Sequence, residues 1–151
     1  MLQKYLDKLE YNRILDIIAN YCSTYIGQNC VSHMIPSNDK DLVKRMLDET
    51  SSAQTLLFRK GEPPMSNITN IEIWIKNLKS YNPLSAKALL DVAHVLQTSR
   101  LIHDYFFADE TFDLSSFAVL EDYFSMLYYN ETIEKNILNS ILDEYTISDD
   151  A

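Results

Sequence analysis

The sequence predicts an all-α fold, an elongated or irregular bundle of about six to seven helices that forms a single domain over residues 1–151. Only two glycines and four prolines occur in the 151 residues, so the residues that form tight β-hairpin turns are scarce. Apolar residues recur three and four positions apart along the whole chain. The content of 46% hydrophobic residues allows one sizeable core, and no apolar run reaches the roughly 18 residues of a membrane span.

Two short helices are expected near the start, over residues 10–22 and 25–34. Ser23 and Thr24 offer helix caps in the middle of the apolar pattern, and Gly27 weakens it, so one continuous rod is disfavoured. Pro36 ends the second helix. The apolar residues of this pattern are Leu9, Ile14, Leu15, Ile17, Ile18, Tyr21, Cys22, Tyr25 and Ile26.

Two long helices follow, each with recognisable ends. The first begins at residues 37–39 with an acidic first turn and runs to about Arg59; Gly61 supplies a residue that tolerates positive φ. The second begins after Pro83 with Ser85 as its cap and runs to Phe107. These helices are the longest that the pattern predicts.

Three shorter segments complete the bundle. The apolar block 68–78 predicts a helix of about two and a half turns, with a strand as the alternative because the block is rich in β-branched residues. Residues 114–129 predict one helix, and residues 131–144 predict the last, after a break at Asn130. A further turn or cap is expected at 148–151.

Charge is distributed unevenly. Residues 1–100 carry 12 basic and 10 acidic side chains, whereas residues 101–151 carry one basic side chain, Lys135, and 12 acidic ones. An acidic surface repels phosphate, so we expect no strong binding of nucleic acid and no binding to an anionic membrane by this chain. No secretory leader is recognisable, and we expect a cytoplasmic location.

The residues that could carry chemistry do not form a recognisable site. Gly27 and Gly61 stand 34 residues apart, which excludes the usual phosphate-binding loops. Cys22, Cys30 and His33 match no recurrent zinc spacing, so we expect two reduced core thiols and a helix-end imidazole. We therefore expect no metal-binding and no cofactor-binding residues in this chain.

His94 and His103 lie about 13 Å apart along one predicted helix, too far to share a metal unaided, and are expected to be partly buried polar residues.

Catalytic residues are equally absent from the pattern. The consecutive carboxylate pairs point about 100° apart on a helix and are expected to solvate an outer face; they are Asp48 with Glu49, Glu121 with Asp122, and Asp143 with Glu144. A cluster of aromatic residues without intervening basic residues favours core packing or a protein interface over a nucleic-acid platform. The cluster is Tyr105, Phe106, Phe107, Phe112, Phe117, Tyr123, Phe124, Tyr128 and Tyr129.

Several short motifs follow one another along the chain: Leu9-Glu10-Tyr11-Asn12-Arg13-Ile14-Leu15, Asn20-Tyr21-Cys22, Thr24-Tyr25-Ile26-Gly27, Pro36-Ser37, Asp48-Glu49-Thr50, Arg59-Lys60-Gly61, Leu84-Ser85 and Leu89-Leu90-Asp91. Their order resembles the amino-terminal end of the second bacterial MutS subfamily. Residues 147–151 resemble a further family segment, and the likeness is looser over 108–146. Residues 62–65 and 104–113 depart from the family pattern.

The resemblance implies that this chain is a truncated, non-catalytic part of the MutS core and lever region. It implies a longer parent that is a homodimeric, mismatch-repair-like ATPase using ATP and Mg²⁺, with a carboxy-terminal Smr nuclease module. It further implies that the parent engages branched DNA or rescues collided ribosomes. Two other classes remain open, a free-standing acidic helical interaction module and a small helical enzyme with a pocket in the bundle.

Overall fold

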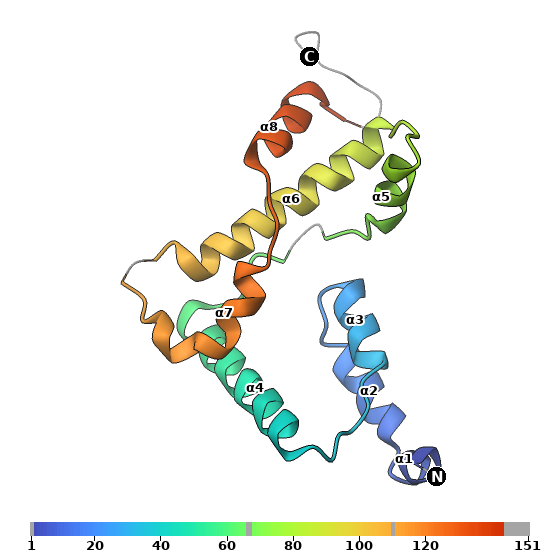
Figure 1. Ribbon diagram of the computed structural model, residues 1–151, viewed down its shortest axis with the longest axis vertical. Helices are drawn as coiled ribbons and strands as arrows, with labels where there is room; N and C mark the ends of the chain where they lie inside the picture. The colour runs from blue at the N-terminus through green and yellow to red at the C-terminus, as the bar shows by residue number, and fades with distance from the viewer. Residues whose placement is uncertain (1, 66–67, 110, 144–151) are drawn as a thin grey trace. The chain divides into compact units, whose positions relative to one another are not determined.

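The computed structural model describes residues 2–65, 68–109 and 111–143 (Figure 1). Within these ranges the chain is all-α, with no β-strand, as the sequence predicted. The elements are α1 (Leu2–Lys8), α2 (Tyr11–Ala19), α3 (Tyr25–Ser32), α4 (Lys40–Lys60), α5 (Glu72–Lys79), α6 (Ala86–Phe107), the 3₁₀ helix η1 (Leu114–Phe117), α7 (Ala118–Ser125) and α8 (Glu131–Ser140). The contacts divide the chain into two compact units, residues 1–38 and 39–151. The single domain expected from the sequence stays a prediction.

The first unit contains helices α1, α2 and α3, and α2 contacts both of the others. Helix α1 was not expected from the sequence, yet its Leu6 is buried, as is Leu15 of α2. Glu10 separates the two helices because its backbone is left-handed, with φ of 52°. Thr24 caps α3 by accepting a hydrogen bond from the Gly27 amide at 3.0 Å, which confirms the predicted break at this cap.

Helix α4 has the capped ends that its sequence predicts. The Asp39 carboxylate accepts hydrogen bonds from the amides of Asp41 and Leu42, which satisfies two free donors of the first turn. At the other end Gly61 adopts a φ of 76°, a conformation that a side chain would strain. The helix therefore spans 21 residues without interruption.

Helix α6 is the longest helix described in the second unit, and it contacts both α7 and α8. The Ser85 hydroxyl accepts a hydrogen bond from the Ala88 amide and caps the helix, which continues for 22 residues, about 33 Å. Helix α8 packs along α6, while α7 contacts both α6 and α4 (Figure 1). Near the end of α6, Phe106 is fully buried in a cluster with Leu56, Phe117 and Leu120. This cluster is the core that the aromatic residues predicted.

The expected single helix over 114–129 is wrong. Its first turn is the 3₁₀ helix η1, held by Asp113, whose carboxylate accepts hydrogen bonds from the Ser115 amide at 3.2 Å and hydroxyl at 2.6 Å. Helix α7 then ends at Ser125, where Met126 and Tyr128 are largely exposed and no packed face supports a further turn.

Two other expected boundaries shift. The helix predicted over 68–78 is α5, which begins at Glu72 and ends at Lys79, and the strand alternative is wrong. Helix α8 ends at Ser140, because Ile141 adopts an extended backbone and turns its side chain into a buried position. The turn expected at 148–151 lies outside the described residues.

Candidate functional site

The cysteines do not form the pair of core thiols that the sequence predicted. Cys22 is half-buried, with its sulfur 3.7 Å from the Ile18 carbonyl oxygen, but Cys30 is exposed on α3. The prediction is wrong for Cys30 because α3 buries no residue of its own. His33 lies at the end of α3 as expected, with Nδ1 2.8 Å from the Asn29 carbonyl oxygen.

The other two histidines are partly buried, as predicted. His103 lies against the rings of Phe107 and Tyr129, at centroid distances of 4.7 and 5.0 Å, and its Nδ1 is 3.4 Å from Asp104. No group of three or more histidines, cysteines and carboxylates within the described residues is placed to hold a metal ion.

The aromatic set divides into a buried and an exposed part. Phe106 stacks on Phe124 at 4.2 Å, and Phe112 stacks on Phe117 at 5.2 Å, which confirms the packing role for these rings. Tyr123 and Tyr128 are more than half exposed. Only part of the set therefore contributes to the core, and the rest lies at the surface.

The junction between the ends of α4 and α6 is held by a lysine and a tyrosine. The Lys60 ammonium donates to the Tyr105 carbonyl oxygen at 2.6 Å and lies 4.5 Å from the centre of the Phe112 ring. The Tyr105 hydroxyl donates to the Gly61 carbonyl oxygen at 2.7 Å, and burial raises the pKa of this phenol. This junction fixes the position of α4 against α6.

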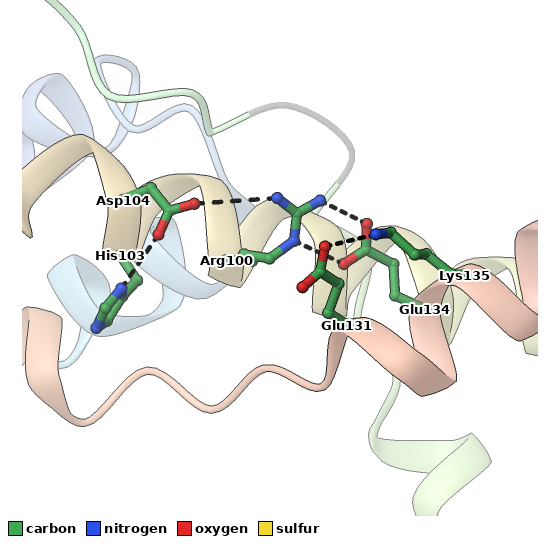
Figure 2. Close-up of polar contacts among 6 residues, drawn as sticks. All are labelled: Arg100, His103, Asp104, Glu131, Glu134 and Lys135. Carbon is green, nitrogen blue, oxygen red and sulfur yellow. Dashed lines mark hydrogen bonds and ion pairs between the residues drawn. The ribbon is translucent and has the colours of Figure 1, made fainter. Parts of the chain in front are cut away.

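The most specific polar constellation joins the middle of α6 to α8. Arg100 donates two hydrogen bonds to Glu134, from Nε at 3.0 Å and from the terminal nitrogen at 2.7 Å (Figure 2). The Glu134 side chain is only 3% exposed, and Arg100 is 22% exposed. The third guanidinium nitrogen lies 3.9 Å from the carboxylate of Asp104, one turn further along α6. The pair thus joins two residues that are 34 positions apart.

The electrostatics of this constellation suit a fixed contact rather than proton transfer. The hydrogen bonds to Glu134 raise the pKa of Arg100, a group already permanently protonated. Next to it, the ion pair of Glu131 with Lys135 at 2.7 Å is solvent-exposed, and Lys135 lowers the pKa of Glu131 (Figure 2). An arginine held in a bidentate pair with a buried carboxylate positions helices and offers no free acid or base.

Sequence reasoning missed this pair, although a weak signal exists. Ile137 and Leu138 follow Glu134 by three and four residues and share one face of α8 with it. A carboxylate on an apolar helix face requires a partner, and Arg100 is the last basic residue before Lys135. The carboxylate pairs that the sequence singled out are different: Glu49 is engaged by Arg45 at 2.9 Å, and Glu144 lies outside the described residues.

Three relatives illustrate what this chain is similar to. It is 32% identical over 143 residues to endonuclease MutS2 of Ruminiclostridium cellulolyticum, a match that covers 95% of this chain and 18% of the relative. It is 30% identical over 151 residues to endonuclease MutS2 of Clostridioides difficile, covering 100% of this chain and 19% of the relative. These matches confirm the resemblance to MutS2. Endonuclease MutS2 of Bacillus cereus is 30% identical over 153 residues, again with 19% of its length covered.

Similarity to MutS2 therefore extends over nearly the whole of this chain but over less than a fifth of each relative. No family model matches the chain, and no solved structure matches it. Within the described residues no helix is both long and apolar enough to cross a membrane.

Proposed function

We propose that this chain is a non-catalytic core and lever segment of a MutS2-type protein that processes DNA. The support comes from relatives named as MutS2 endonucleases, which match nearly all of this chain with about a fifth of their length. The activity of such a protein, ATP hydrolysis and DNA cleavage, then belongs to residues outside this chain.

The observation that carries the proposal is the way in which α6 is held along its length. Trp74 of α5 donates to Asp91 at 3.3 Å near the beginning of the helix, and Glu134 of α8 binds Arg100 further along. Phe106 is buried near the end, against α4 and α7. A 22-residue helix with packed partners at several points resists bending, which is the property that a mechanical lever needs.

The residues present do not fit ATP or Mg²⁺. Gly61 ends α4 with open space around it, and Gly27 lies within α3, where an added Cβ would meet the Thr24 hydroxyl at 3.2 Å. Neither glycine opens a phosphate-binding loop, and no carboxylate cluster among the described residues suits a metal ion. We therefore propose that ATP and Mg²⁺ bind to the remainder of the parent chain. From the resemblance we further propose that the parent is a homodimer and that it engages branched DNA or collided ribosomes.

A chimera tests the lever. The region of the Clostridioides difficile relative that matches this chain is replaced by residues 1–151, and ATP hydrolysis and DNA cleavage are measured separately. Leu101→Gly with Asp104→Gly then softens α6 at two exposed positions, at about 1 kcal/mol each relative to alanine. We expect ATP hydrolysis to persist and ATP-dependent cleavage to fall at least tenfold.

The matched control is Leu101→Ala with Asp104→Ala, which removes the same side chains but keeps the helix stiff. This control should hydrolyse ATP and cleave DNA at the rates of the unmodified chimera. Cleavage by the glycine variant at the control rate would show that α6 does not transmit motion. Loss of ATP hydrolysis in the glycine variant alone would show that this segment builds the ATPase site, contrary to the proposal.

A further inference from the structure

Helices α4 and α7 form an open seam on the second unit, and Tyr123 of α7 lies in the middle of it. On one side of Tyr123 is an apolar groove of about 270 Å³. Its lining includes Leu57 of α4, the loop residues Pro63 and Met65, and Phe124 of α7. On the other side is a groove of about 320 Å³, lined by Arg45, Glu49, Val119, Asp122, Tyr123 and Met126.

The side chains along this seam present an apolar surface to solvent. Met126 is 80% exposed and Tyr123 is 53% exposed, while Leu57, Met65 and Val119 are each 42–46% exposed. A contiguous apolar patch with methionines on both sides of a tyrosine is typical of a surface that adapts to a protein partner. This patch and its two grooves are called the Tyr123 seam below.

The charge around the Tyr123 seam restricts what can occupy it. Arg45, the basic residue that lines the second groove, is already engaged by Glu49 at 2.9 Å and by the Tyr123 hydroxyl. Within the described part of the chain the Asp122 carboxylate has no ion-pair partner, and between Arg100 and Lys135 the sequence contains no basic residue. The seam is therefore apolar with an uncompensated negative charge.

We propose that the Tyr123 seam is a docking site for a basic amphipathic protein segment. An apolar side chain of the segment fills the groove beside Leu57 and Met65, and a lysine or arginine pairs with Asp122. Nucleic acid is disfavoured because the surrounding sequence is acidic, and a second copy of this chain is disfavoured because both copies carry a net charge of −9. This proposal does not depend on the lever function.

The binding probe is a 14-residue amphipathic helical peptide made only of leucine and lysine, titrated into the 151-residue chain at about 150 mM salt. Methyl NMR on the methionines reports the location of binding. We expect shifts at Met65 and Met126, and none at Met34, which lies in the first unit. A peptide of the same pattern with glutamate in place of lysine should bind at least tenfold more weakly.

Two variants and two matched controls locate the contact. Asp122→Lys and Met126→Gln change exposed residues of the seam, one its charge and the other its apolar contact, and should each weaken binding about tenfold. Glu121→Lys makes the same charge change on the neighbouring residue of α7, and Phe58→Gln replaces an apolar side chain on α4 that is 91% exposed. Neither control residue lines the grooves, and both variants should bind as the unmodified chain does.

Each other outcome contradicts the proposal. Equal weakening by seam and control variants would mean that the peptide binds the acidic chain without a site. Equal binding of the glutamate peptide would remove the role of Asp122. Displacement of the peptide by self-association of the chain, or by duplex DNA, would assign the seam to a second copy or to nucleic acid.

Discussion

The two contacts that α6 makes with later helices differ in their chemistry. Near its end, Phe106 is fully buried against Phe117 and Leu120, with no polar group required. In its middle, Arg100 and Glu134 form a bidentate ion pair with α8. One contact is an apolar cluster, and the other depends on two opposite charges that must be removed from water together.

This difference separates stability from specificity. Burial of apolar area stabilises the fold in proportion to area, whatever the exact partners are. A buried ion pair gains little net free energy, because desolvation of both charges offsets their attraction, but either charge left alone is costly. We therefore infer that the Phe106 cluster supplies stability, while the Arg100–Glu134 pair selects the register in which α8 lies on α6.

The largest expected effect is at the apolar contact. Phe106→Ala should lower the free energy of unfolding by about 3–5 kcal/mol, because it removes a fully buried ring and leaves a cavity. Urea unfolding of the 151-residue chain measures it. Phe58→Ala is the matched control, since Phe58 is 91% exposed, and should change the stability by less than about 0.5 kcal/mol. A loss below about 1 kcal/mol for Phe106→Ala would mean that the cluster is not the core.

The next effect tests the asymmetry of the ion pair. Glu134→Leu alone should destabilise the chain by about 2–3 kcal/mol, somewhat less than a fully buried pair, because Arg100 retains 22% exposure. Adding Arg100→Met to the Glu134→Leu variant should restore most of the lost free energy of unfolding. Glu131→Ala, which breaks the exposed pair with Lys135, should cost less than about 1 kcal/mol. Additive losses in the double variant would show that the two charges stabilise independently, against the inference about register.

The apolar side of this comparison could be predicted from the sequence, because its signals are local. Helices α4 and α6 fall within a few residues of their expected ranges, since a polar cap and an apolar repeat mark each of them. Phe106 and Phe117 likewise follow from the aromatic pattern. Local rules failed at residues 126–129, where helix propensity is adequate but no packed face supports the turn.

The polar side could not be predicted in the same way. The spacing around Glu134 indicates that its carboxylate needs a partner, but it does not identify Arg100, 34 residues earlier, because the pairing is set by how α8 packs on α6. Exposure of Cys30 was missed for a similar reason, since the burial of a thiol depends on tertiary neighbours that the sequence pattern does not name. The candidate site therefore emerges only from the structure.

A smaller effect concerns the start of α8, the helix that carries Glu134 of the ion pair. The Asn130 side chain accepts a hydrogen bond from the Ile133 amide at 3.0 Å, so Asn130→Ala should cost about 1 kcal/mol. Compared with the unmodified chain, the Asn130→Ala variant should show faster hydrogen exchange in α8 and unchanged exchange in α4. Asn136→Ala, at an exposed position within α8, is the matched control and should leave exchange unchanged or slower. Equal acceleration in both helices would mean that α8 does not open separately from the cluster.

The smallest effect is a pH dependence at the edge of the apolar cluster. Hydrogen bonds from the hydroxyls of Ser115 and Ser116 lower the pKa of Asp113, which holds η1 and its buried Phe117. A carboxyl with a lowered folded-state pKa stabilises the fold fully above its unfolded pKa of about 3.9, and the contribution disappears as the pH falls through the folded value. Carboxyl NMR titration should therefore place the Asp113 midpoint below that of an unperturbed aspartate. Ser115→Ala with Ser116→Ala should raise this midpoint and reduce the loss of stability between about pH 5 and pH 2. An unchanged midpoint would mean that the hydroxyls do not stabilise the charged form, and the acid sensitivity of this end of the bundle would then have to come from another carboxylate.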